Sequence, residues 1–463
     1  MSNDADRDAL ASSLSEALGG RVLRPGDDSF ETVAALWSAR RTHHPDLIAL
    51  VAGAADVQRV LKAVPAEVPI AVRGGGHDWV GRAHVEGGIT LDLSQMRGVQ
   101  IDARAGTAKV QGGARLDDLI DAAAEHDLVA AVGTVNEVGF AGLALGGGYG
   151  PYLGTLGLAA DTIISAEVVL ADGSIVRASD EERADLLWAL RGGGGNFGVV
   201  TSLEISLEEM PAMLAGAVVF SATELSEVLT SLERILPTVP DQLAVSPAIG
   251  SGPDGGAALL VSLNWNGEAG EGSEWVRAIE RMGTPLASTI GPATPTQALH
   301  ALDGMFPSGR HYTLRTASVA TLTPAVIEIL VDGERCRTSP LSAINIHHFH
   351  GAATRVGAEY SAWALREPHL MIEIIAATAD AEGHDEQIAW ADRILDALRP
   401  LALPAAYPNL LSPGDSARAA AIYGNNLARL NAVKRDVDPT GRFTGIPMGL
   451  PHRPLPGRAD HQR

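Results

Sequence analysis

The sequence predicts an α+β protein with two lobes, the second of which holds an antiparallel sheet covered by helices on one face. Two observations support this fold class. The chain has 463 residues, which is too long for one ordinary core. Glycine-dense segments are concentrated before Pro211, whereas strand and helix patterns alternate after it.

Composition and charge restrict the class of protein. Hydrophobic residues make up 46% and charged residues 20% of the chain, as in globular proteins. The net charge of −21 repels nucleic acid and anionic membranes, so we expect neither as a partner. The single cysteine, Cys336, excludes an internal disulfide. With no signal pattern at the start and no long apolar run, we expect a cytoplasmic protein.

The first elements form a β-α-β pattern. After an amphipathic helix at residues 9–18, apolar runs at 47–51 and 68–72 predict strands, and the pattern of residues 55–64 predicts a helix between them. A parallel strand pair joined by a helix sends the turn that follows to the strand's carboxyl end, the usual place for a ligand.

That turn reads Arg73-Gly-Gly-Gly-His77. Three glycines expose backbone N–H groups that can approach an anion, and the histidine adds a reactive ring beside them. A glycine-rich turn between two strands also needs no ligand, so this segment alone leaves both interpretations open.

Residues 88–114 predict an antiparallel meander with strands at 89–93, 99–101 and 108–110, followed by a helix at 115–126. The segment 139–150 has six glycines in twelve residues. Such a density disfavours a packed helix or strand and indicates that another group approaches the backbone closely.

A hairpin is predicted over residues 163–177, with its turn at Asp172 and Gly173, before a helix at 185–190 and a strand at 199–207. Between these last two, Gly193, Gly195 and Gly198 have the G-x-G-x-x-G spacing. A dinucleotide fingerprint follows a strand and opens a helix, whereas this one follows a helix and opens a strand. We therefore expect a cofactor-contacting loop and not a Rossmann motif.

The second domain and the tail follow from the same patterns. We predict strands at residues 213–220, 257–265, 313–320, 341–348 and 370–377, helices at 226–236, 274–282, 324–331 and 385–398, and loops at 250–256 and 290–295. The tail predicts a short strand near residue 407 and one helix at 416–435.

Taken in order, the glycine segments resemble those of the berberine bridge enzyme-like flavoproteins of the vanillyl-alcohol-oxidase superfamily. The matching motifs are Arg73-Gly-Gly-Gly-His77, residues 133–150, Gly157-Leu-Ala-Ala-Asp161, residues 187–200, Tyr407-Pro-Asn409 and the Tyr423-Gly-x-Asn motif with its Asp-Pro turn. The similarity runs from about residue 40 to residue 447 with matching spacing.

The resemblance implies a PCMH-type FAD-binding domain into which a substrate domain is inserted. The expected segments are 1–30 at the start, 31–207 for FAD, 208–405 for substrate, and 406–463 returning to the FAD domain. The expected FAD contacts are Arg73, Gly74, Gly75, Gly76, His77, Asp78, Gly133, Thr134, Val138, Gly139, Gly142, Gly146, Gly147, Gly148, Gly150, Asp161, Gly198, Val199 and Val200.

In this family the histidine is linked covalently to the flavin 8α-methyl group, which would be His77 here. Some members carry a second link through a cysteine, but Val135 occupies that position, so we expect a single link. Val138 occupies the family's oxygen-gate position, where a small residue favours dioxygen as electron acceptor.

Oxidation of an alcohol requires a base near the carbon that loses hydride. The family uses the tyrosine of a Tyr-x-Asn motif, which Tyr407 and Asn409 match. A phenol has a pKa of about 10, so a cationic or hydrogen-bonding neighbour would have to lower it. The alternative is that Tyr407 is a half-buried strand aromatic.

The resemblance thus implies an FAD-dependent oxidase acting on a small secondary metabolite or sugar, with dioxygen as partner. A redox-neutral cyclase, a dehydrogenase with another acceptor, and a binding protein with a degenerate flavin site are the alternatives. His347, His348 and His350 suggest a metal, but no third ligand has metal spacing and we expect none.

Overall fold

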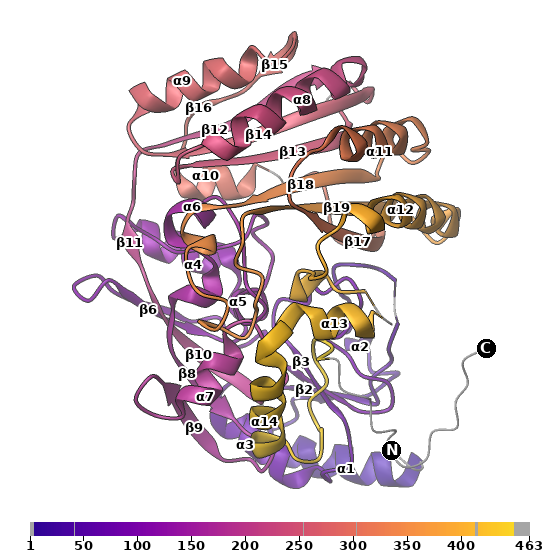
Figure 1. Cartoon of the computed structure of the whole chain (residues 1–463). Helices are drawn as coiled ribbons and strands as arrows, with labels where there is room; N and C mark the ends of the chain where they lie inside the picture. The colour runs from indigo at the N-terminus through magenta and orange to yellow at the C-terminus, as the bar shows by residue number, and fades with distance from the viewer. Residues whose placement is uncertain (1–3, 41, 253, 302, 413–414, 449–463) are drawn as a thin grey trace.

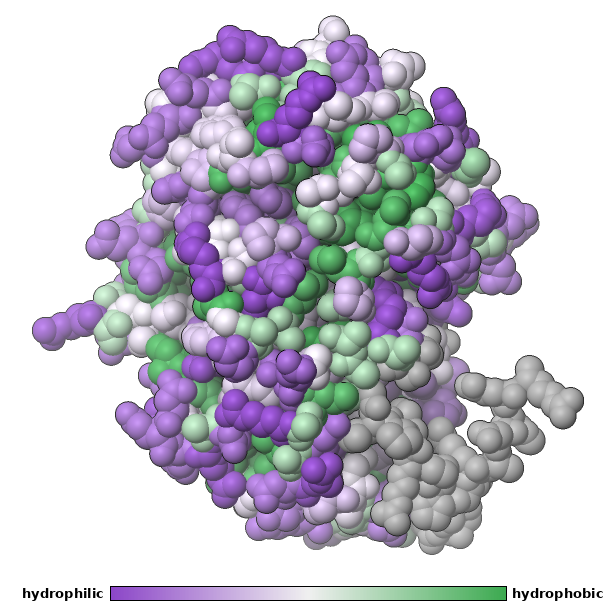
Figure 2. All heavy atoms as spheres, in the orientation of Figure 1, coloured by the Kyte–Doolittle hydropathy of each residue, from purple (hydrophilic) through white to green (hydrophobic). Residues whose placement is uncertain are grey.

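The computed structural model describes residues 4–40, 42–252, 254–301, 303–412 and 415–448. Figure 1 shows two lobes: one large sheet carrying helices on its outer face, above a lobe built from smaller sheets and helices. The predicted α+β class is confirmed. Within the described ranges no helix has the length and apolarity needed to cross a bilayer. Hydrophilic side chains cover much of the face in Figure 2, and hydrophobic ones gather mainly on the upper lobe.

The first sheet of the lower lobe has the strand order β1-β2-β4-β3. Its strands and nearby helices are α1 (Asp4–Ala17), β1 (Val22–Leu23), α2 (Phe30–Val33), β2 (Leu47–Leu50), α3 (Ala54–Ala63), β3 (Ile70–Arg73) and β4 (Ile89–Asp92). Strands β2 and β3 run in the same direction, as the predicted β-α-β unit requires. They are not neighbours, however, because β4 lies between them and pairs parallel with both. The predicted meander is therefore wrong at its first strand. All four residues of β4 are buried, as expected for a central parallel strand.

The second sheet of this lobe is antiparallel, with the order β5-β6-β10-β8-β9. Its strands are β5 (Val99–Asp102), β6 (Thr107–Gln111), β8 (Ile163–Val169), β9 (Ile175–Ser179) and β10 (Val199–Ser206). The same stretch of chain forms the helices α4 (Leu116–Ala124), α5 (Phe140–Leu145), α6 (Leu153–Leu156) and α7 (Ala184–Leu190), and β7 (Leu128–Val129) pairs with β11 (Glu208–Glu209) as a separate two-stranded sheet. The predicted hairpin is β8 and β9, and α7 is the predicted helix.

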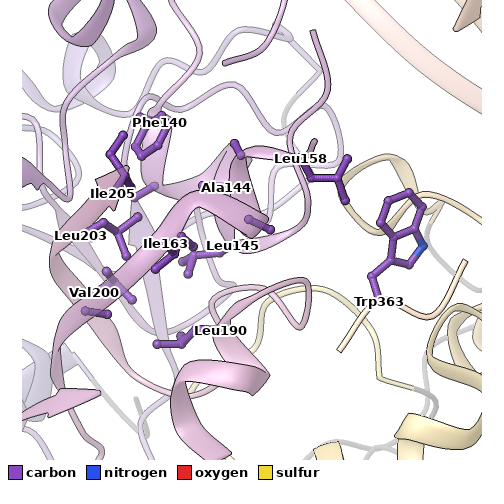
Figure 3. Close-up of a cluster of buried hydrophobic side chains, with 14 of the residues drawn as sticks. Phe140, Ala144, Leu145, Leu158, Ile163, Leu190, Val200, Leu203, Ile205 and Trp363 are labelled. Atoms are coloured by element: carbon purple, nitrogen blue, oxygen red, sulfur yellow. The ribbon is translucent and has the colours of Figure 1, made fainter. Parts of the chain in front are cut away.

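One glycine segment differs from the prediction. Its first half is the short helix α5, whose Phe140, Ala144 and Leu145 are buried among β10 side chains (Figure 3). Only Gly142 lies within α5, and the remaining glycines follow the helix or cap it. The segment can therefore pack with its apolar side chains, and the prediction that it forms no helix is wrong for residues 140–145.

The upper lobe contains an eight-stranded antiparallel sheet in the order β15-β12-β14-β13-β18-β19-β17, with β16 paired to β12. Its elements are β12 (Met213–Ser221), α8 (Leu225–Ile235), β13 (Leu243–Ser251), β14 (Ala257–Asn266), α9 (Ala269–Glu280), β15 (Pro285–Ser288), β16 (Gly291–Pro292), α10 (Pro295–His300), β17 (His311–Val319), α11 (Pro324–Arg335), β18 (Ala343–Phe349), β19 (His369–Thr378) and α12 (His384–Leu398). The five predicted strands and four predicted helices are present. Strand β13 was missed because Pro247 and Gly250 interrupt its apolar pattern.

The two faces of this sheet have different roles. On β14, Leu259, Val261 and Leu263 lie on one face of the sheet and pack into the core beneath the helices. The intervening Ser262 and Asn264 face the lower lobe. The inner face of the sheet is thus left to form one wall of a cavity between the lobes.

The tail returns to the lower lobe. Its elements are the 3-10 turn η6 (Pro408–Leu410), α13 (Ser416–Tyr423), η7 (Gly424–Asn426) and α14 (Leu427–Val437). The predicted strand near residue 407 is wrong, and the predicted single helix is broken at Gly424, whose φ of 47° no helix adopts. Beyond α14, Arg442 donates hydrogen bonds to the carbonyls of Leu61 and Val64, and Phe443 bridges to Ile70. Residues 449–463 of the predicted tail lie outside the described residues.

Candidate active site

A cavity of about 420 Å³ lies between the lobes and receives residues from both of them and from the tail. Its size is in the range of small-molecule sites. Fourteen of the residues predicted from the sequence line it: Gly74, Gly75, Gly76, His77, Asp78, Gly133, Thr134, Val138, Gly139, Gly142, Gly198, Val200, Tyr407 and Asn409. Segments far apart in the sequence are therefore brought together at one site.

Seven predicted cofactor contacts do not line the cavity: Arg73, Gly146, Gly147, Gly148, Gly150, Asp161 and Val199. Arg73 instead forms an ion pair with Asp92 on β4, with 2.6 Å between Nη1 and Oδ2. Asp161 pairs with the buried Arg366 at 2.7 Å. Val199 packs in the hydrophobic core beneath the first sheet.

The glycine turn after β3 is pressed against the second glycine segment. A Cβ atom on Gly75 would collide with the backbone nitrogen of Gly139, and one on Gly139 would collide with the nitrogen of Gly75. Gly76 has a φ of 70°, which favours glycine. The two loops therefore form a continuous wall of bare backbone, which side chains at these positions would break.

His77 projects from this turn into the cavity. Its Nε2 atom is buried and has no hydrogen-bond partner. Burial lowers the pKa of His77 to about 4, so the ring is neutral at pH 7 and keeps a free lone pair. The ring of Trp37 stacks on it, with 4.6 Å between centroids.

The glycines that follow α5 make room for the predicted catalytic pair. A Cβ atom on Gly146 would overlap the side-chain amide of Asn409, and one on Gly147 would lie 2.9 Å from Cε2 of Tyr407. The backbone nitrogen of Gly148 donates a hydrogen bond of 2.6 Å to the Tyr407 hydroxyl. These glycines contact the Tyr-x-Asn motif, which explains their density without a direct contact to a ligand.

Tyr407 and Asn409 lie together at the cavity wall. The Nδ2 of Asn409 is 3.5 Å from the Tyr407 hydroxyl and donates to it. Both hydrogen bonds lower the pKa of the phenol, but burial outweighs them and raises the pKa of Tyr407 to about 12. The lowered pKa that work near neutral pH would require is therefore not reached, because desolvation of the phenolate outweighs the two hydrogen bonds.

The structure adds an acid–base pair that was not predicted. Glu373 on β19 and His347 on β18 both line the cavity, with 3.1 Å between Oε2 and Nε2. Asn345 donates a second hydrogen bond to the same carboxylate oxygen at 3.2 Å. A sequence signal existed: Glu373 is the one charged residue in the apolar run from Leu370 to Ala377, and buried carboxylates are rare without a partner.

Arg82 was also missed. Its side chain lines the cavity, its Nε lies 3.0 Å from Asp78, and its Nη2 donates to the backbone carbonyls of Asn409 and Leu411. It thus joins the residue after His77 to the loop that carries Tyr407. One of its nitrogens, Nη1, is buried without a partner.

No metal site is found within the described ranges: they contain no group of three or more histidine, cysteine or acidic side chains able to hold an ion. His348 lies on β18 and His350 follows the end of this strand, and their rings stack with 4.4 Å between centroids. His347 points to the opposite face and pairs with Glu373.

The residues present fit a bound FAD. A Cβ atom on Gly142 or on Gly195 would meet nothing within 4 Å, although both residues line the cavity, so their backbone stands open to a ligand. The orphaned Nε2 of His77 lies in the same cavity. Bare backbone that can approach an anion, together with a neutral imidazole, defines an oxidoreductase site for a large flat cofactor.

Comparisons with known proteins also point to FAD as the cofactor. Residues 45–179 match the family described as "FAD binding domain". The FAD-linked oxidoreductase aurO of Gibberella zeae is 30% identical over 442 residues, which cover 93% of this chain and 86% of that protein.

Solved structures give the same result. The crystal structure of 6-hydroxy-D-nicotine oxidase from Arthrobacter nicotinovorans has a TM-score of 0.83 and 29% identity, covering 91% of this chain and 96% of the other. The berberine bridge enzyme-like protein 1 of Physcomitrella patens has the same fold, with a TM-score of 0.86, 21% identity, and coverage of 96% and 99%.

The chain therefore belongs to the FAD-linked oxidoreductases, with the fold of the berberine bridge enzyme-like structures, and it is an enzyme. The resemblance found in the sequence and the fold it implied are confirmed.

Proposed function

We propose that this enzyme is an oxidase that takes hydride from an alcohol or amine carbon of a small secondary metabolite or sugar and passes the electrons to dioxygen. The observation that carries the proposal is that His77, with its unpartnered Nε2, lines the same cavity as Tyr407 and the Glu373–His347 pair. A cofactor-attachment group and two proton-accepting groups thus share one enclosed space.

FAD would be held by the loops around Gly75, Gly139 and Gly195 and attached to His77. Val135 lines the cavity at the position of the second link in some relatives, and Cys336 is exposed elsewhere in the chain, which supports a single link. Bound FAD would supply the hydride acceptor. Val138 also lines the cavity, consistent with its proposed role beside the path of dioxygen.

Tyr407 would accept the proton of the substrate's hydroxyl or amino group. The hydrogen bonds from Gly148 and Asn409 would stabilise the phenolate, which is the form that accepts a proton, and they hold the oxygen in one place. Burial opposes that charge, so Tyr407 acts as a base only after its own proton has been passed on to another acceptor.

Glu373 and His347 offer the cavity a second proton acceptor. They approach from the inner face of the upper sheet, whereas Tyr407 comes from the tail. The rings of Tyr149 and His347 are 4.6 Å apart, and those of Tyr149 and Tyr407 are 5.0 Å apart, so Tyr149 lies between the two groups. A substrate between the lobes would contact both.

The substrate side of the cavity combines these polar groups with apolar ones. Leu260, Leu314, Phe306 and Ile375 line it together with Asn345. Such a wall suits a compact molecule with one apolar part and a hydrogen-bonding nitrogen or oxygen. The structurally similar 6-hydroxy-D-nicotine oxidase is named for a substrate of this kind.

The proposal is tested by screening alcohols, amines and glycosides for hydrogen peroxide release by the purified holoenzyme. A substrate that bleaches the flavin without air, with colour restored by air, is the expected result. A turned-over compound whose product keeps the oxidation state of the substrate, or bleaching that air does not reverse, would contradict an oxidase. Flavin that stays with acid-precipitated protein in the wild type, and not in His77→Ala, is expected for the single link.

A further inference from the structure

Trp37 is fixed on three sides between the glycine turn and the upper lobe. Its backbone nitrogen donates to the carbonyl of Gly76 at 2.9 Å, and its carbonyl accepts from the nitrogen of Gly309 at 2.9 Å. Its indole Nε1 donates to the carbonyl of Phe306 at 2.8 Å. With 8% of its surface exposed, the residue cannot shift without breaking contacts to both lobes.

Three aromatic rings stack in a row at this point. His77 and Trp37 lie 4.6 Å apart with 19° between their planes, and Trp37 and Tyr312 lie 3.9 Å apart with 4° between theirs. Tyr312, on β17, is fully buried, and its hydroxyl donates to the carbonyl of Pro307 at 2.8 Å. The stack therefore runs from the cofactor turn into the substrate lobe.

This stack restricts the plane of the His77 ring. The torsion that turns an imidazole about its Cβ–Cγ bond has broad minima, so contacts must fix the plane. Nε2 of His77 has no hydrogen bond to do so. The broad face of Trp37 is the flat surface against the ring, and Tyr312 backs it from the far side.

We propose that Trp37, backed by Tyr312, is the positioning residue that sets the plane of His77 for covalent attachment of FAD. This inference rests on the proposed link at His77. Trp37 is held in place by the loop of residues 305–310 from the upper lobe, through its indole at Phe306 and through its main chain at Gly309; the main-chain bond remains in Trp37→Phe.

Covalent attachment of FAD to His77 is a two-electron oxidation. A bond forms between a ring nitrogen of His77 and the 8α carbon, while that carbon and the imidazole each lose one hydrogen. The two protons and two electrons reduce the bound flavin, and dioxygen removes them as hydrogen peroxide. The nitrogen lone pair must point along the forming bond, so a tilt of the ring slows this step strongly.

The test uses apoprotein incubated with saturating FAD, followed by flavin fluorescence of the denatured polypeptide over time. Trp37→Leu removes the stack and should slow covalent attachment on the order of tenfold or more. Trp37→Phe keeps a flat ring but loses the bond to Phe306, and it should attach within about threefold of wild type. The matched control is Trp188→Leu, which removes a buried indole in α7 that bonds to Glu359 and not to the cavity.

Attachment in folded Trp37→Leu at the wild-type rate would overturn the proposal, as would a Trp37→Phe variant as slow as Trp37→Leu. If Trp37→Leu does not fold, as judged by thermal unfolding, Tyr312→Leu replaces it, and an unchanged rate in that variant overturns the proposal equally. A wild-type protein without covalent flavin would instead refute the link at His77, so the two failures are distinguishable.

Discussion

The hydroxyl of Tyr407 accepts a 2.6 Å hydrogen bond from the backbone nitrogen of Gly148, which holds the proposed base against the glycine segment. This contact joins the tail to a loop encoded more than half the chain earlier. It exists only because Gly147, beside it, has a φ of 132° and carries no side chain. Exchange of the hydroxyl for hydrogen is therefore a clean test of its role.

Tyr407→Phe should slow flavin reduction by substrate about 10²-fold or more, since general-base catalysis contributes about 10²–10⁴. Flavin content should stay at the wild-type level, because the hydroxyl bonds to Gly148 at 2.6 Å and takes no part in the attachment of FAD to His77. Anaerobic stopped-flow measurement of flavin absorbance checks the rate. Reduction as fast as in wild type would assign the proton to Glu373 and His347 instead.

The pH dependence of flavin reduction follows from the raised pKa of Tyr407. A base acts only when deprotonated, so with a pKa of about 12 the rate should still be rising at the alkaline end of the accessible range. The negative charge of Glu373 raises this pKa, so Glu373→Gln should shift the rise to lower pH. Rates of wild type and variant between pH 6 and about 10.5 test the shift. A shift to higher pH would contradict the arrangement.

Gly142→Ala should leave the fold intact and reduce flavin binding. Nothing lies within 4 Å of a Cβ at this position, so the methyl group meets no protein atom and enters the cavity instead. Flavin absorbance per polypeptide should fall while the thermal unfolding temperature of the apoprotein is unchanged. Gly270→Ala in α9, which has equally open surroundings outside the cavity, is the control and should keep its flavin.

Asp161→Asn should destabilise the protein by about 3–5 kcal/mol, as for other buried pairs that lose one partner. Asp161 and Arg366 are 10% and 3% exposed and pair at 2.7 Å. Denaturant unfolding measures this cost. The exposed pair of Asp396 and Arg399 gives the comparison, and Asp396→Asn should change stability little. Equal costs for the two variants would contradict the assignment of a structural role to Asp161.

Acid should destabilise the fold through its buried histidines. Burial lowers the pKa of His348 to about 3 and that of His369 to about 4. Below the ordinary histidine pKa of 6.5 the unfolded chain binds protons that the folded chain refuses, so stability falls from pH 6.5 towards pH 3. His348→Gln should flatten this decline in thermal unfolding, whereas the exposed His126→Gln should not.

The sequence predicted the elements whose apolar period is long or whose turns are chemically distinct. The helix α12 and the hairpin turn at Asp172 and Gly173 are examples. It failed for β4, because a strand of four residues carries no sign of whether its neighbours are parallel or antiparallel. It also failed for β13, whose Pro247 is tolerated since its pairing with β18 begins only at Ala248.

Site residues were predictable where backbone geometry demands a particular amino acid. At Gly75 only glycine permits the close contact with Gly139. At His77 only histidine supplies an imidazole. The pairing of Glu373 with His347, which was considered only as a metal ligand, was not predicted, since it depends on which strand lies beside which, and this is set by packing of the whole sheet. Asp161 was assigned by analogy, whereas its surroundings show an ion pair.

Arg442 and Phe443 close the lower lobe from the far end of the chain, against α3 and β3. The first lobe can therefore be completed only after residue 443 has been synthesised, and the inserted sheet is made while that lobe waits. Truncation just before Arg442 should consequently yield an unliganded, protease-sensitive product.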